Sequence, residues 1–318
     1  MKRRNFIKNT TTLISGLPLI NLNIFEMSNL TSDKYEFTVG NFKATIFRDF
    51  MFKYQAKDYF INAKQDELEQ AIKTYKIVPE NIPSPFIAIL LQGQNKKILI
   101  DTGMGFSEQP LEFRGNKIPQ KGKLVQLLHD EGIKNEDITD VIVTHFHPDH
   151  IGGIFSSVGQ LNFPKAKYHI YEKEWNYWHS TKSDMQVPLF KFFVEKNITP
   201  LTKYDLNLYK GDFVDIVSGI KAVKATGHTP GQIALIIDNP SSPLLYISDA
   251  FLHPLHIERL DWQTNYDTDH KKAKRSRTKL LDLAHKQNML VNGFHFDFPG
   301  LGRVEKSKNK WVWKYTDK

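Results

Sequence analysis

Cysteine is absent from this sequence of 318 residues. Disulfide bonds, thiolate zinc ligands and cysteine nucleophiles are therefore excluded, and any metal has to be held by histidine and carboxylate side chains. Uninterrupted apolar runs of about 18 residues are also missing after the N-terminal segment, so we expect no membrane-spanning helix. The sequence shows no internal repeat at the periods typical of solenoids.

The chain carries a modest excess of positive charge. There are 43 Lys and Arg against 35 Asp and Glu, a net charge of +8, with 40% hydrophobic and 25% charged residues. These proportions are ordinary for a soluble globular protein. The excess attracts anionic partners weakly and is not by itself the footprint of nucleic-acid binding. We expect a small-molecule substrate and no nucleic acid; homodimerisation is left open.

Residues 1–30 look like a targeting segment. Lys2-Arg3-Arg4-Asn5-Phe6 resembles the twin-arginine export motif, and a mildly apolar stretch runs from Leu13 to Phe25. Glycine, proline and asparagine interrupt that stretch, and no Ala-x-Ala cleavage site follows, so a disordered basic N-terminus is the alternative. The first interpretation predicts a periplasmic or exported protein, and the second a cytoplasmic one.

A dense group of metal-ligand types follows one short apolar run. Val141-Ile142-Val143-Thr144 predicts a buried strand, and His145, His147, Asp149 and His150 come directly after it. Because side chains alternate along a strand, His145 and His147 project on the same side. Pro148 stops the strand, and Asp149 at the start of a helix brings itself and His150 back toward them. Neutral imidazoles with a carboxylate suit zinc and similar divalent metals. Ordinary surface histidines are the weaker alternative.

Three more candidate ligands lie just beyond the ends of other predicted strands, namely His228, Asp249 and His295. Loops at one edge of stacked sheets converge in space, so residues far apart in sequence can meet there. With the four from the central motif this makes seven ligands. Two metal ions that share one bridging carboxylate would use all seven.

Strand-like segments come in runs, with helix-like segments between them. Tyr35–Val39 and Phe42–Phe50 predict paired strands, Gln65–Tyr75 and Lys271–Gln287 predict helices, and Met104–Pro119 predicts a loop. This order suggests sheets packed face to face with helices outside. No linker divides the chain, so we expect a single domain over residues 31–318.

The order of these motifs resembles the metallo-β-lactamase superfamily. The motifs are the Asp101-Thr102-Gly103 turn, the His145–His150 cluster, the Gly227–Gly231 loop, Asp249 and His295. The sequences Ser248-Asp249-Ala250, Tyr266-Asp267-Thr268-Asp269 and His295 to Gly302 look most like the branch that holds methyl parathion hydrolases and quorum-quenching lactonases. Ser248 stands where the superfamily often has glycine, and Asp297 where this branch often has proline. The resemblance implies an α+β fold, a four-layer αββα sandwich.

The resemblance also implies roles for the ligands. His145, His147 and His228 would hold one divalent ion, and Asp149, His150 and His295 a second. Asp249 would bridge the two ions, most simply zinc, and Asp101 would orient a ligand imidazole from behind. Asp149 and Asp249 are the candidate catalytic residues.

The leading hypothesis is a metal-dependent hydrolase. A hydroxide bridging two ions would attack a neutral ester, lactone or phosphotriester, without a serine or cysteine nucleophile. Trp178 and Phe296 are the candidate walls of an apolar substrate pocket. The alternatives are a nuclease of the same superfamily, a non-catalytic metal-binding protein on the same fold, and a mononuclear iron oxidase.

Overall fold

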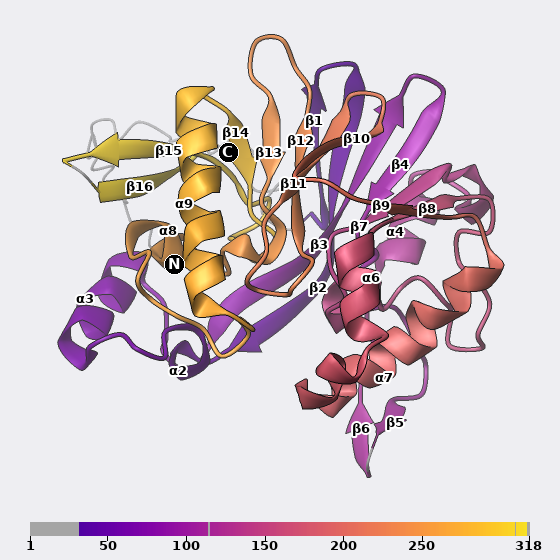
Figure 1. Cartoon of the computed structure of the whole chain (residues 1–318), viewed down its shortest axis with the longest axis horizontal. Helices are drawn as coiled ribbons and strands as arrows, with labels where there is room; N and C mark the ends of the chain where they lie inside the picture. The colour runs from indigo at the N-terminus through magenta and orange to yellow at the C-terminus, as the bar shows by residue number, and fades with distance from the viewer. Residues whose placement is uncertain (1–31, 114, 309, 317–318) are drawn as a thin grey trace, which may run out of the picture. The chain divides into compact units, whose positions relative to one another are not determined.

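Two seven-stranded sheets organise the chain (Figure 1). We describe residues 32–113, 115–308 and 310–316 of a computed structural model, so the predicted leader at residues 1–30 lies outside the described part. In spatial order, the first sheet consists of β1 (Lys34–Val39), β2 (Phe42–Tyr54), β3 (Ile82–Gly93), β4 (Lys96–Ile100), β7 (Asp140–Val143), β8 (Lys167–Tyr171) and β9 (Leu206–Tyr209). The second consists of β10 (Phe213–Val217), β11 (Ile220–Lys224), β12 (Ile233–Ile237), β13 (Leu244–Tyr246), β14 (Leu290–Asn292), β15 (Leu301–Ser307) and β16 (Lys310–Tyr315).

Helices and short helical turns connect the strands. The α-helices are α2 (Ala56–Tyr59), α3 (Gln65–Tyr75), α4 (Leu124–Asp130), α5 (Pro148–Ile151), α6 (Glu172–Trp178), α7 (Pro188–Asn197), α8 (Pro254–Glu258) and α9 (His270–Lys286). The 3₁₀ turns are η1 (Asn135–Asp137), η2 (Thr181–Met185), η3 (Thr199–Lys203) and η4 (Ser248–Ala250). No helix in the described ranges is long and apolar enough to cross a bilayer.

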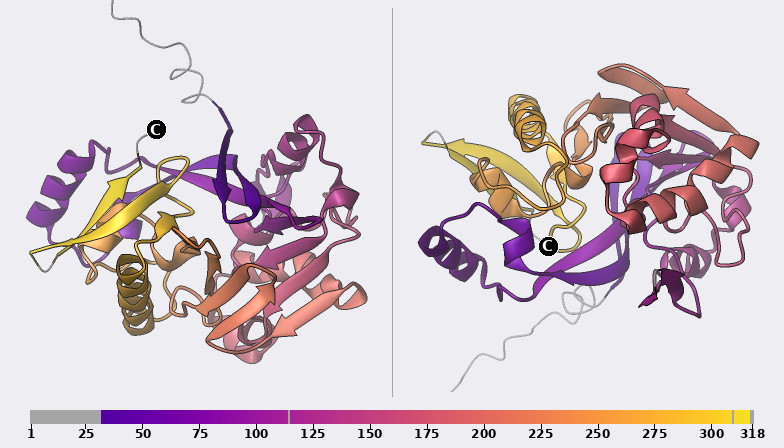
Figure 2. Two further views of the ribbon diagram at one scale, coloured as in Figure 1. Left: turned by 90° about the horizontal axis from the view of Figure 1, so that it is seen from above. Right: turned by 60° about the horizontal axis from the view of Figure 1, so that its bottom comes forward.

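Three apolar clusters define the layers. Between the sheets, Ile89 and Ile142 of the first pack in one cluster with Leu235 of the second. The other face of the first sheet is covered by α4 and α7, and the other face of the second by α9 (Figure 1, Figure 2). Alternating strand residues therefore bury one face between the sheets and one face under helices. The predicted four-layer αββα sandwich is confirmed.

The strand that leads to the central histidine motif is fully enclosed. All four residues of β7 are buried, and β7 pairs in parallel with β4 on one side and β8 on the other. Parallel strands that are covered on both faces have continuous apolar sequences, so apolar and polar residues do not alternate in Val141-Ile142-Val143. The carboxyl end of β7 is thereby fixed by both neighbours.

Local differences from the sequence prediction concern short or irregular strands. The expected loop Met104–Pro119 contains a small hairpin of β5 (Leu111–Phe113) and β6 (Asn116–Ile118). Strand β2 continues to Tyr54 instead of ending at Phe50, because its pairing with β3 resumes after a register shift between Arg48 and Phe50. Strands β9 and β15 have weak apolar patterns of their own, and pairing with neighbours decides their structure.

Candidate metal centre

The loop after β7 turns four potential ligands toward one point. His147 caps α5 with an extended backbone, and Pro148 occupies its first turn, where the missing N–H costs nothing. Thr144, on the same loop, donates its backbone N–H to Asp101 Oδ1 at 2.9 Å. His145, His147, Asp149 and His150 are all buried, so the loop presents them inward and not to bulk solvent.

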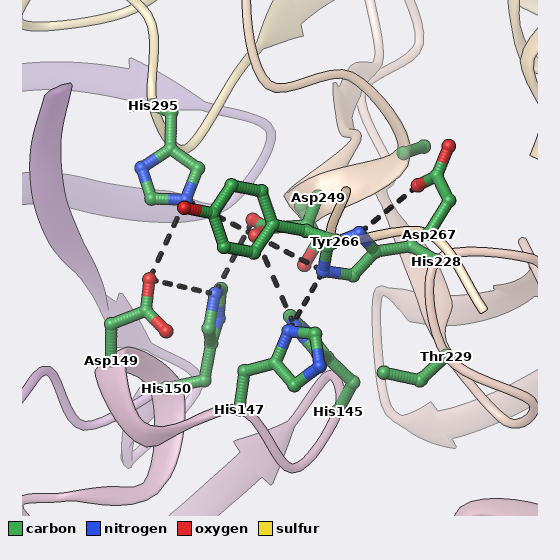
Figure 3. Close-up of polar contacts among 12 residues, drawn as sticks. His145, His147, Asp149, His150, His228, Thr229, Asp249, Tyr266, Asp267 and His295 are labelled. Atoms are coloured by element: carbon green, nitrogen blue, oxygen red, sulfur yellow. Dashed lines mark hydrogen bonds and ion pairs between the residues drawn. The ribbon is translucent and has the colours of Figure 1, made fainter. Parts of the chain in front are cut away.

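The second sheet supplies three more ligands from three separate loops. His228 lies between β11 and β12, Asp249 lies in η4 directly after β13, and His295 lies between β14 and β15. All three are at least 97% buried. Figure 3 shows their side chains facing those of the central motif, with Asp249 between the histidines. The structure thus brings together all seven residues singled out in the sequence.

Asp249 belongs to two groups of four ligand atoms. The groups are His145, His147, His228 and Asp249, and Asp149, His150, Asp249 and His295; within each, the ligand atoms lie within 4.8 Å of one another. Asp249 Oδ1 is 3.3 Å from His150 Nε2, and its Oδ2 is 3.5 Å from His228 Nε2 and 3.1 Å from His295 Nε2. The two oxygens of this one carboxylate therefore face both groups.

The donor atoms suit divalent cations. His145 Nε2, His150 Nε2 and Asp249 Oδ1 are buried and have no hydrogen-bond partner within the described protein. Burial, followed by the neighbouring histidines, lowers the pKa of His145 and of His147 well below the usual value, which leaves neutral imidazoles. Burial alone would lower the pKa of His150 too, but Asp249, Asp101 and Asp149 raise it well above the usual value. The site therefore offers buried donor atoms without protein partners and carboxylates that favour positive charge nearby. A histidine and carboxylate site for zinc-like ions has both properties.

Asp101 fixes the imidazole of His150. Its Oδ2 lies 2.8 Å from His150 Nδ1 and accepts a hydrogen bond from Tyr246 Oη at 2.9 Å. A partner at Nδ1 fixes the tautomer and directs Nε2 toward Asp249. The role suggested for Asp101 is therefore matched by its position. Its backbone adopts φ 57°, a left-handed conformation that the short polar side chain tolerates.

Ser248 occupies the position where the superfamily often has glycine. Its backbone has φ 46°, the left-handed region that glycine enters most easily. The serine hydroxyl lies 2.9 Å from Thr144 Oγ1. Serine in place of glycine therefore adds a buried hydrogen bond between the loops that follow β13 and β7.

Two buried carboxylates behind the ligands were given no role from the sequence. Asp267 Oδ1 lies 3.2 Å from His228 Nδ1, and its Oδ2 accepts from the Arg277 guanidinium at 2.7 Å. Glu174 of α6 accepts from the backbone N–H groups of Phe146 and Gly231. Glu174 has no sequence signal beyond its charge, and the Tyr266–Asp269 motif that contains Asp267 indicated the family branch but not this contact.

A cavity of about 330 Å³ opens next to the ligands. Aromatic and aliphatic side chains form most of its wall, and His147, Asp149, His228, Asp249 and His295 form part of it. The apolar lining residues are Phe52, Tyr54, Tyr59, Phe86, Met104, Ile118, Pro148, Leu189, Phe190, Phe193, Leu252 and Tyr266. No lysine or arginine lines the cavity among the residues that the structure describes.

The two aromatic residues expected in the pocket do not line it, and that prediction was wrong. Trp178 is 2% exposed and donates its indole N–H to Glu174, which turns the ring into the core beneath α7. Phe296 is 1% exposed and packs against Trp313 on the outer face of the second sheet. Phe190, whose ring centroid is 4.6 Å from that of His147, takes the place expected of Trp178.

Comparisons with known proteins identify the family of this chain and its structural relatives. The model of the metallo-beta-lactamase superfamily matches residues 88–286. An N-acyl homoserine lactonase from a Bacillus species is 27% identical over 207 residues, which cover 61% of this chain and 75% of the relative.

Two solved structures share the fold over nearly their full length. The first is AidC, a dizinc quorum-quenching lactonase in complex with a product, with a TM-score of 0.77 and 24% identity. The second is the hydrolase AbOPH of the beta lactamase superfamily, with a TM-score of 0.79 and 23% identity. Each alignment covers 91% of this chain and 99% of the other. With the matched fold, the seven clustered ligands and the family match over residues 88–286, the chain belongs to the metallo-β-lactamase superfamily.

Proposed function

We propose that this protein is a hydrolase that binds two divalent cations and cleaves a neutral ester, with a lactone bearing an apolar substituent as the favoured substrate. The observation that carries the proposal is the pair of ligand groups that share Asp249 beside an aromatic cavity. The relative named N-acyl homoserine lactonase supports the lactone within this class of substrates.

In this proposal His145, His147 and His228 hold the first cation and Asp149, His150 and His295 hold the second, with Asp249 between them. The nitrogen and oxygen donors favour zinc, and a dizinc lactonase of the same fold supports that choice. Cations bound in such a site act as Lewis acids on a substrate oxygen and lower the pKa of water to about 7.

The protein's own contribution is to orient the ligands and to select the substrate. Asp101 and Asp267 each pair with the Nδ1 atom of a ligand histidine, which directs its Nε2 toward the centre. The aromatic wall binds apolar substituents and excludes water from them. The volume of about 330 Å³ is within the range for a small-molecule site.

The nuclease alternative is disfavoured by the position of the positive charge. The basic side chains of α9, among them Lys271, Lys274 and Arg275, line a separate surface hollow with Phe213. They do not line the cavity beside the ligands. A phosphodiester backbone in that cavity would meet no basic side chain, whereas a neutral lactone, aryl ester or phosphotriester needs none.

The test is metal content and a substrate panel measured on one preparation. Protein stripped of metal is reloaded with zinc or manganese, analysed for metals, and assayed with lactones, aryl esters and phosphotriesters. We expect two ions per chain and the highest kcat/KM for lactones. One ion at most, or cleavage of DNA without cleavage of any neutral ester, would overturn the proposal.

A further inference from the structure

Glu174 lies where two ligand-bearing loops meet. It is on α6 and 1% exposed, and its carboxylate accepts four hydrogen bonds. Oε1 accepts from the Phe146 backbone N–H at 3.1 Å and from Trp178 Nε1 at 2.8 Å. Oε2 accepts from Thr229 Oγ1 at 2.8 Å and from the Gly231 backbone N–H at 2.7 Å.

Three of these bonds, from Phe146, Thr229 and Gly231, connect the segments that carry the first ligand group, and the fourth, from Trp178, lies within α6. Phe146 stands between His145 and His147, and Thr229 directly follows His228. Close packing adds to the connection, because a Cβ atom on Gly231 would lie only 2.2 Å from the Glu174 backbone nitrogen. Neither loop can shift relative to the other without breaking bonds to this one side chain.

Only a carboxylate satisfies this position. All four partners donate, and an ionised carboxylate is the side chain with acceptors alone. The amide of a glutamine has the same size, but its NH₂ group would face either the Gly231 N–H or the N–H groups of Phe146 and Trp178. A buried donor opposed to another donor is unfavourable, and movement of a loop would relieve this repulsion.

We propose that Glu174 is a positioning residue that holds His145, His147 and His228 in the arrangement that binds the first cation. This inference rests on the two-cation function proposed above. The second group is held differently: Asp101 orients His150, and His295 belongs to the loop between β14 and β15. Loss of Glu174 therefore acts on one half of the centre.

Calorimetric titration of metal-free protein with zinc tests this asymmetry. We expect two binding steps in the native protein. In Glu174→Gln, one step weakens by roughly 10- to 100-fold, the range typical when an outer partner of a metal ligand is changed, and the other is retained. Thermal melting of the metal-free proteins separates a defect in folding from a defect in binding.

Two backgrounds identify which half is affected. His295→Ala leaves the first group complete, and His147→Ala leaves the second complete. Glu174→Gln should weaken zinc binding in the first background and leave it unchanged in the second. Glu172→Gln is the matched control, because Glu172 lies on the same helix but pairs at the surface with Lys210.

A milder change keeps the test independent of folding. Thr229→Val removes one of the four donors and should weaken the first step in the same direction by a smaller factor. Equal zinc affinity in Glu174→Gln and native protein, or equal weakening in both backgrounds, would overturn the positioning role. A native protein that binds a single ion would overturn the two-cation proposal instead, and the His295→Ala background would still decide the role of Glu174.

Discussion

Arg277 and Asp267 form a buried ion pair, with Arg277 Nη2 lying 2.7 Å from Asp267 Oδ2 directly behind His228. The Arg277 Nε–H also donates to the carbonyl of Ala250, the residue after Asp249, at 2.6 Å. Burial alone would raise the pKa of Asp267, but Arg277 and His228 hold it well below its usual value. One guanidinium thus supports two of the loops that carry ligands.

Replacement of Arg277 with methionine should destabilise the fold strongly. The change keeps an apolar stem but leaves the Asp267 carboxylate buried without its partner, which typically costs 3–5 kcal/mol, an order-of-magnitude figure. Urea unfolding of the metal-free protein measures the loss. Arg275→Met, an exposed position on the same helix, should change stability by less than about 0.5 kcal/mol. Similar losses in the two variants would contradict this role for the ion pair.

Asp249→Asn should abolish activity while the fold remains. The amide keeps the size of the side chain, but it presents one donor where both carboxylate oxygens now face histidines. We expect fewer than two bound ions and a fall in kcat/KM greater than the roughly 100-fold typical of outer-partner changes. Metal analysis and circular dichroism accompany the assay. Near-normal turnover with two ions bound would refute the shared-ligand assignment.

Substrate preference should follow apolar fit. Each methylene added to the acyl chain of an ester or lactone should raise kcat/KM by up to about 0.8 kcal/mol, or roughly four-fold, until the cavity is full. Phe190→Ala should flatten this trend, because Phe190 lines the cavity beside His147. Phe192→Ala, on the same helix but outside the lining, is the control. A flat series with a steep salt dependence would favour electrostatic recognition instead.

A buried polar cluster at the start of β7 should make the stability of the fold depend on pH in the acidic range. Asp140, at the start of β7, accepts from Lys96 Nζ at 2.9 Å and lies 2.8 Å from His169 Nε2. Burial alone would raise the pKa of Asp140, but these partners and Thr139 lower it well below its usual value. The resulting stabilisation is complete above the unfolded-state pKa of about 3.9 and is lost as the pH falls below it toward the folded-state pKa.

Comparison of native protein with Asp140→Asn isolates this contribution. Urea midpoints of both metal-free proteins are measured at neutral pH and at about pH 3, where Asp140 is mostly protonated in the unfolded chain. The variant should be less stable at neutral pH, and the difference should shrink at acidic pH. A difference that is constant with pH would show that the loss is not linked to ionisation of Asp140.

The ligand set could be predicted because its signals are local. His145 to His150 form one continuous motif, and His228, Asp249 and His295 each follow a segment with a clear strand pattern. A buried strand and a strand end are properties that a short window of sequence encodes. The sandwich fold could be predicted from the apolar patterns of the same strands. Strand β15 has three charged residues among seven and shows no comparable pattern.

The supporting residues and the pocket wall could not be predicted in the same way. Glu174 lies in a helix rich in charge and aromatic residues, and only the approach of two distant loops distinguishes it from Glu172. Phe190 and Trp178 are both large apolar residues near the motif. Which one faces the cavity is decided by the indole hydrogen bond to Glu174, a contact that composition does not encode.

The placement of the ligands on both sheets has a consequence for how the protein matures. The central motif belongs to the first sheet, whereas His228, Asp249 and His295 belong to loops of the second. During synthesis the chain therefore passes through stages in which four of the seven ligands are already present but the centre cannot yet form. In the proposed two-cation centre, full metal uptake would require that both sheets have been made and have docked, so bound metal would mark complete folding as well as readiness for catalysis.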